Sequence, residues 1–166
     1  MTAKTYSVLF LCTHNSARSI LAEALLNHIG AGRFRAYSAG SSPRNNQRPN
    51  PLGLQVLQQA GIPTEGLRSK SWDEFAEADA PLMDLIITVC DNAAGEVCPI
   101  WPGHPATAHW GFPDPSQVGG DDDAKRKAFM DVASGLQKRI ELLAALPLEK
   151  LDLLSMQAEL KKLAGA

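Results

Sequence analysis

One short stretch of the chain carries residue types that can bind and attack a small anion. A thiol and a guanidinium lie at its two ends in the order Cys12-Thr13-His14-Asn15-Ser16-Ala17-Arg18-Ser19. Backbone N–H groups of such a loop can converge on one point, where the arginine adds a bidentate contact to a tetrahedral oxyanion. The same positive potential favours the thiolate, which is the nucleophilic form of cysteine. We therefore predict that Cys12 attacks an oxyanion held by residues 13–19.

Two further thiols, Cys90 and Cys98, follow the most β-branched apolar run of the chain, residues 84–89. We expect this run to be a central parallel strand. Loops at the carboxyl ends of parallel strands converge on the ligand, so Cys90 should lie near Cys12, which follows the predicted strand 6–11. Cys98 comes eight residues later on a loop that contains Gly95 and can bend. The alternative is that the three cysteines are buried, inert thiols.

Strands and helices alternate along the predicted chain, and they must position these thiols. The expected strands are 6–11, 34–39, 84–89 and a short one at 107–109, and the expected helices are 19–29, 51–60, 71–78, 121–146 and 148–164. This alternation is typical of an α/β layer fold with a parallel sheet. Within the first loop, Asn15 tolerates the left-handed backbone of a tight turn, and its amide can brace the loop.

Charge and hydropathy exclude several classes of protein. The net charge is −2, which argues against a nucleic-acid binder that relies on a broad basic surface. No apolar run approaches the roughly 20 residues needed to cross a bilayer, and no secretory signal is visible. We therefore expect a cytoplasmic protein that contacts neither nucleic acid nor membrane.

The first loop identifies a family resemblance. The segment VLFLCTHNSARS resembles the active-site loop of the low-molecular-weight tyrosine phosphatases and of the arsenate reductases that share their fold, with His14 where both usually have glycine. The resemblance covers about residues 6–145. It implies a three-layer α/β/α fold with a four-stranded parallel sheet. On this basis we divide the chain into a phosphatase-like domain, residues 1–146, and a C-terminal helical extension, residues 147–166.

A second landmark is the segment Trp110-Gly-Phe-Pro-Asp114-Pro115-Ser116. In these families an Asp-Pro pair late in the chain supplies the general acid, so the resemblance implies that Asp114 protonates the leaving oxygen. Pro115 would keep the backbone of Asp114 extended and aim its carboxyl at the pocket. The alternative is an ordinary turn, in which Asp-Pro is a common pair.

The segment TVCDNAAGEVCPIWP, followed by HWGF, resembles the thiol-cascade region of thioredoxin-coupled arsenate reductases. The resemblance implies reduction of arsenate to arsenite by a relay from Cys12 to Cys90 to Cys98. It implies no bound cofactor and an external thiol reductant, either thioredoxin or glutathione with glutaredoxin. Phosphate and sulfate are expected to compete weakly with arsenate. The rival functions are a tyrosine phosphatase that forms a Cys12 phosphoenzyme and a non-enzymatic oxyanion binder or redox sensor.

Some members of this family bind potassium near the active-site loop, and Asn15, Glu23 and Ser38 match part of that site. Lys70 lies where another ligand would be expected, and its ammonium could replace the cation. We therefore predict no metal ion. For Glu23 and Ser38, a solvated charge and a capping hydroxyl are the alternative interpretation.

Overall fold

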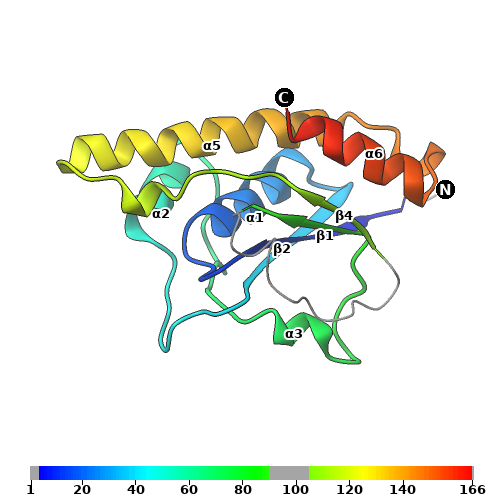
Figure 1. Ribbon diagram of the computed structural model, residues 1–166, viewed down its shortest axis with the longest axis horizontal. Coiled ribbons are helices and arrows are strands. Elements are labelled where there is room, and N and C mark those ends of the chain that lie inside the picture. The colour runs from blue at the N-terminus through cyan, green and yellow to red at the C-terminus, as the bar shows by residue number, and fades with distance from the viewer. Residues whose placement is uncertain (1–3, 90–104, 166) are drawn as a thin grey trace.

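The computed structural model describes residues 4–89 and 105–165. Four parallel strands form its sheet, which Figure 1 shows between the helices. Their order is β2-β1-β3-β4, so β1 and β3 are central, as predicted for residues 84–89. The bounds are Tyr6–Cys12 for β1, Phe34–Gly40 for β2, Leu85–Thr88 for β3 and Ala106–His109 for β4. Cys90 and Cys98 lie outside the described residues.

Helices cover both faces of the sheet (Figure 1). Their bounds are Arg18–Ile29 for α1, Pro51–Gln59 for α2, Asp73–Ala76 for α3, Asp122–Ala144 for α5 and Leu153–Leu163 for α6. The described residues also form two short 3-10 helices, η1 at Pro115–Gln117 and η2 at Leu148–Lys150. The expected three-layer fold is thus confirmed. In the parts of the chain described here, no helix combines the length and the apolar character needed to cross a membrane.

The predicted helix over 148–164 is wrong as a single element. The chain forms the turn η2 and then starts again as α6, because the Asp152 side chain accepts a hydrogen bond from the Ser155 N–H. Aspartate is favoured as an N-cap and disfavoured in a helix interior, so it begins a new helix. The helix predicted at 71–78 is also shorter than expected and is limited to α3.

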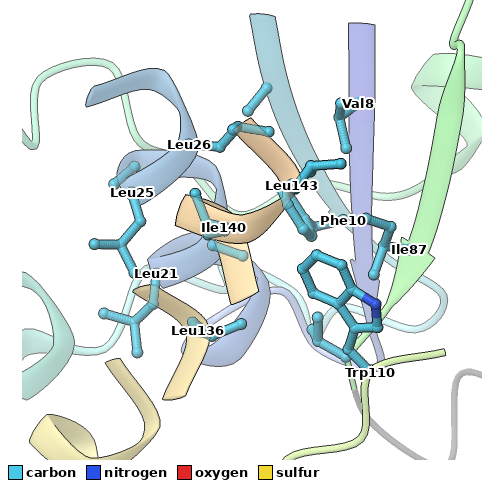
Figure 2. Packing of buried hydrophobic residues seen from close by; sticks show 14 of the residues in the cluster. Val8, Phe10, Leu21, Leu25, Leu26, Ile87, Trp110, Leu136, Ile140 and Leu143 are labelled. Atoms are coloured by element: carbon cyan, nitrogen blue, oxygen red, sulfur yellow. The ribbon is translucent and has the colours of Figure 1, made fainter. Parts of the chain in front are cut away.

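Alternate residues of β1 enter two separate apolar clusters. Val8 and Phe10 face α1 and α5, whereas Leu9 and Leu11 face the segment that contains α3. This is the period of two that a strand buried on both faces requires. Figure 2 shows the larger cluster, in which side chains of α1 and α5 pack against Phe10, Ile87 and Trp110. This cluster includes five residues of α5 at helical spacing: Phe129, Val132, Leu136, Ile140 and Leu143.

The carboxyl ends of the strands lie at one edge of the sheet. Cys12 pairs with Gly40 of β2, and Leu11 pairs with Thr88 of β3. The N–H of Val89, the last described residue before position 90, donates to the Leu11 carbonyl at 2.9 Å. The loop that begins at Cys12 is therefore at the edge where α/β proteins bind their ligands.

Candidate active site

A polar cavity of about 200 Å³ opens above this edge of the sheet. Three residues predicted to do chemistry, Cys12, Arg18 and Asp114, line it together, although Asp114 is far from the others in sequence. The remaining lining residues are His14, Ser16, Ala17, Arg44, Gln47, Asn50, Ser116 and Gln117. None of the described residues that line the cavity is aromatic (Phe, Tyr or Trp). A cavity of this size and polarity suits a small oxyanion.

Arg44, Gln47 and Asn50 were missed by sequence analysis. They belong to the polar loop between β2 and α2, for which sequence analysis made no functional prediction. A hydrogen bond from the Asn50 N–H to the Ser16 carbonyl, 2.8 Å long, joins this loop to the first one. The polar composition of the loop was the available signal, but only the fold shows that it forms a wall of the cavity.

The first loop is braced from behind by Asn15. Its backbone is left-handed, with φ of 57°, as predicted for this residue, and its side chain is fully buried. The Asn15 amide donates to Ser19 Oγ at 2.8 Å and to Ser38 Oγ at 2.9 Å, and its oxygen accepts from the Lys70 N–H at 2.9 Å. Asn15 and Ser19 therefore support the loop from its buried side, whereas His14, Ser16 and Ala17 face the cavity.

A glycine lets β2 approach the loop closely. A Cβ atom at Gly40 would lie 2.6 Å from the Thr13 carbonyl oxygen and 3.0 Å from the Asn15 nitrogen. The Ser41 and Ser42 N–H groups donate to the Cys12 and Thr13 carbonyls. The Cys12 and Thr13 carbonyls are thus directed at the segment that follows β2, and carbonyl oxygens directed there do not repel an anion in the cavity.

Helix α1 begins beside the cavity with Ala17 as its N-cap. Within the described residues, no side chain caps this end of the helix. Its first N–H groups and the positive end of the helix dipole are therefore suited to a bound anion. The sequence-predicted cradle is consistent with this geometry.

Arg18 is held at the cavity by residues that follow β4. Its Nη1 donates to the Phe112 carbonyl at 2.9 Å, and its Nη2 lies 3.6 Å from Asp114 Oδ2. The side chain is only 13% exposed, and Arg18 Nε has no hydrogen-bond partner among the described residues. A buried guanidinium N–H at an anion-sized cavity is a donor suited to an oxyanion.

Asp114 presents one carboxylate oxygen to Arg18 and uses the other locally. Its Oδ1 accepts from the Ser116 N–H at 2.9 Å and from Ser116 Oγ at 2.6 Å, which caps η1. Its backbone is extended, as predicted for the residue before Pro115. Oδ2 is therefore the carboxylate oxygen that faces Arg18 at the cavity.

Glu23, Ser38 and Lys70 form a polar cluster behind the loop. Lys70 Nζ donates to the Ser38 and Arg68 carbonyls, each at 2.8 Å, and lies 4.0 Å from Glu23 Oε1. Glu23 accepts from Ser38 Oγ at 2.5 Å. Burial raises the pKa of Glu23 and lowers the pKa of Lys70, and each partner opposes the effect on the other. The solvated-charge alternative for Glu23 does not fit a side chain that is 15% exposed.

Comparison with known proteins gives the family of this chain. The model of the low molecular weight phosphotyrosine protein phosphatase family matches residues 7–156. The chain belongs to this family. It is 34% identical to an arsenate reductase of Halalkalibacterium halodurans over 137 residues, which cover 82% of this chain and 94% of that protein.

Solved structures of this family agree with the assignment. A structure described as an arsenate reductase in oxidized state matches with a TM-score of 0.67 and 26% identity, covering 85% of this chain and 98% of that one. The thioredoxin-dependent arsenate reductase of Corynebacterium glutamicum matches with a TM-score of 0.57 and 26% identity, covering 86% of this chain and 65% of that one. The chain thus shares its family with curated arsenate reductases.

Proposed function

We propose that this protein is an enzyme that reduces arsenate to arsenite and serves arsenic detoxification. The observation that carries the proposal is the cavity that Cys12, Arg18 and Asp114 line together. Its lining is polar, which suits an inorganic oxyanion with no ring to bury. The kinship with arsenate reductases supports the same substrate.

In the first step arsenate binds in the loop against Arg18 and the start of α1. The Cys12 thiolate attacks arsenic and forms a sulfur–arsenic bond. An arsenic–oxygen bond breaks, and Asp114 donates a proton to the departing hydroxide, which leaves as water. Arsenic is still pentavalent after this step, so it must still gain two electrons, which come from the oxidation of Cys12 and Cys90 to a disulfide.

In the second step the Cys90 thiolate attacks the sulfur of Cys12. The sulfur–arsenic bond breaks and its electron pair stays on arsenic, so arsenite leaves and a Cys12–Cys90 disulfide remains. Cys98 then attacks Cys90, which releases Cys12 and gives a Cys90–Cys98 disulfide. The contact of Val89 with Leu11, residues adjacent in sequence to Cys90 and Cys12, supports a short distance between these two thiols.

An external dithiol reductant closes the cycle by reducing the Cys90–Cys98 disulfide. The thioredoxin-dependent relative favours thioredoxin, with glutathione and glutaredoxin as the alternative. Such a cycle suits the cytoplasm, where thiols are kept reduced, and this is the proposed location. No bound cofactor or metal enters any step.

A thiol map by mass spectrometry tests the relay. Reduced enzyme is exposed once to arsenate in the absence of any reductant, and a Cys90–Cys98 disulfide with a reduced Cys12 is expected. The Cys98→Ser variant should stop after about one turnover with a Cys12–Cys90 disulfide, because nothing then releases Cys12. Sustained turnover of this variant with thioredoxin would contradict the relay.

The phosphatase activity of the family is the second candidate, since phosphate and arsenate have the same shape and charge. Weak hydrolysis of an aryl phosphate is expected under either function. Oxidation of NADPH that depends on arsenate, thioredoxin and thioredoxin reductase is expected only for the reductase. Arsenite production in the same assay is expected only for the reductase, and it separates this function from both the phosphatase and a non-enzymatic oxyanion sensor.

A further inference from the structure

The guanidinium of Arg18 depends on one residue that sequence analysis did not single out. Arg18 Nη1 donates to the carbonyl of Phe112, and Arg18 Nη2 faces Asp114 two residues further on. The position of the backbone at Phe112 therefore sets both where Arg18 points and where the Asp114 carboxylate lies. Whatever fixes Phe112 has an indirect effect on oxyanion binding.

Both the backbone and the ring of Phe112 make contacts with other parts of the fold. Its N–H donates to the Val89 carbonyl at 3.2 Å, which ties it to the end of β3. Its ring lies against Gly135 of α5, where a Cβ atom would come within 2.8 Å of the ring edge. The ring thus fills the space that the missing side chain of Gly135 leaves open.

Arg139, one helical turn further along α5, covers this ring. Its guanidinium carbon lies 4.3 Å from the centre of the Phe112 ring, within the range of a cation–π contact. The same guanidinium donates from Nε to the Leu163 carbonyl at 3.1 Å and from Nη2 to the Ala164 carbonyl at 2.9 Å. Arg139 is therefore fixed by the C-terminal end of α6 while it packs on Phe112.

A second contact binds α6 to the same segment. The indole of Trp110, fully buried and in contact with Phe10 (Figure 2), donates from Nε1 to the Leu160 carbonyl at 3.0 Å. Both aromatic residues of the segment that leads to Asp114 are thus linked to α6, through Trp110 directly and through Arg139 for Phe112.

We propose that Phe112 and Arg139 are positioning residues for the oxyanion site and that α6 supports the active site through Arg139. The ring and guanidinium hold the Phe112 carbonyl where Arg18 needs it, although neither side chain lines the cavity. This inference rests on the proposed function, because the roles of Arg18 and Asp114 are assigned there. It extends the site to a helix near the end of the chain.

Calorimetric titration with inorganic phosphate tests the inference on enzyme whose thiols are reduced. Phe112→Leu removes the ring and keeps an apolar side chain, and Arg139→Gln removes the stacked charge. Arg126→Gln is the matched control, because Arg126 is also on α5 but contacts Asp123 and Gln55 instead of the site. Unfolding temperatures of all variants are measured in parallel.

We expect each of the two variants to weaken phosphate binding and to lower kcat/KM for arsenate, by about tenfold for Phe112→Leu, since small misplacements of a positioning group cost up to about a hundredfold. The double variant should lose less than the product of the single effects, because the two side chains act through one contact. Arg126→Gln should leave both quantities unchanged.

Phosphate affinity that stays at the wild-type value in both single variants, even with a lower unfolding temperature, would overturn the inference and leave the contacts purely structural. Multiplicative effects in the double variant would also overturn it. Phosphate binding is measured without turnover, so it separates this inference from the proposed reduction. An enzyme that binds phosphate in this residue-dependent way but reduces no arsenate would refute only the reduction.

Discussion

At the scale of single residues, the cluster of Glu23, Ser38 and Lys70 decides how the loop is supported from behind. Lys70 Nζ is bonded to two carbonyl oxygens and lies near a carboxylate, which is an arrangement of oxygens that suits a cation. We propose that the Lys70 ammonium takes the place of such a cation. It is covalently attached to the chain, whereas an ion would exchange with solvent.

Potassium should therefore have no effect on this enzyme. We expect kcat/KM for arsenate and the unfolding temperature to be the same in potassium chloride and in choline chloride of equal ionic strength, because a second cation beside Lys70 Nζ would be repelled. Steady-state kinetics and thermal unfolding in the two salts check this. A crystal grown in potassium with an ion bound to Glu23 would contradict it.

The raised pKa of Glu23 gives a prediction with a definite sign. Because burial raises this pKa, the stability that the group contributes is complete below its unfolded pKa and is lost as the pH rises through the folded value. The variant Glu23→Gln does not titrate, so its free energy of unfolding should rise relative to wild type from acidic to neutral pH. Urea denaturation at several pH values measures this difference.

Glu74→Gln is the matched control. A hydrogen bond from Arg68 lowers the pKa of Glu74, so the stability contributed by this group is present above its unfolded pKa and is lost as the pH falls through the folded value. Its neutral variant should therefore lose stability relative to wild type as the pH rises. Equal slopes for the two variants would mean that burial does not govern Glu23.

At the scale of elements, two helix glycines with different neighbours should respond oppositely to alanine. At Gly135 a Cβ atom would lie 2.8 Å from the Phe112 ring, whereas at Gly53 of α2 it would be at an ordinary 3.5 Å from Phe129. Gly53→Ala should be neutral or should stabilise by up to about 1 kcal/mol through helix propensity. Gly135→Ala should destabilise by about 1 to 3 kcal/mol through overpacking. Chemical denaturation compares them, and similar gains at both sites would be inconsistent with the contact at Phe112.

Helices and strands could be predicted where an apolar pattern repeats along the sequence. They could not be predicted where a single contact determines where an element begins. The spacing of Phe129, Val132 and Leu136 predicted α5, and the apolar run 84–89 predicted β3. The break before α6 depends on the capping bond of Asp152, which outweighs an amphipathic pattern that continues across it.

The residues of the candidate site fall into the same two groups, predictable and not predictable from the sequence. Cys12, Arg18 and Asp114 were predictable because a loop motif and a family resemblance identify them, whereas Arg44 and Gln47 line the cavity only through the path of a loop. The support of Phe112 by Arg139 joins segments distant in sequence, and neither residue belongs to a local pattern that would predict the contact.

At the scale of the whole molecule, α6 belongs to the same core as the sheet. Leu160 and Leu163 of this helix enter the larger apolar cluster together with residues of β1, α1 and α5. A helix that shares this cluster should unfold with it in one transition, since small domains unfold cooperatively.

Substitutions at two leucines of α6 test whether this helix unfolds together with the core. Leu160 is fully buried and Leu154 is 79% exposed. Leu160→Ala should lower the free energy of unfolding by about 2 to 5 kcal/mol and keep a single transition, whereas Leu154→Ala should change it by less than about 0.5 kcal/mol. Chemical denaturation followed by fluorescence and by circular dichroism reports both. A separate early transition for Leu160→Ala would show that α6 is independent of the core.

In the first loop, the residues that support the backbone differ from those that line the cavity, and this separation has an evolutionary consequence. Asn15 and Ser19 support its backbone from the protein interior, while His14, Ser16 and Ala17 line the cavity. Because the supporting contacts come from Asn15 and Ser19, we expect substitutions at the cavity-lining positions to leave the backbone of the loop in place, and histidine at position 14 is an instance. Directed evolution for other tetrahedral anions, such as vanadate or molybdate, should begin at these three positions.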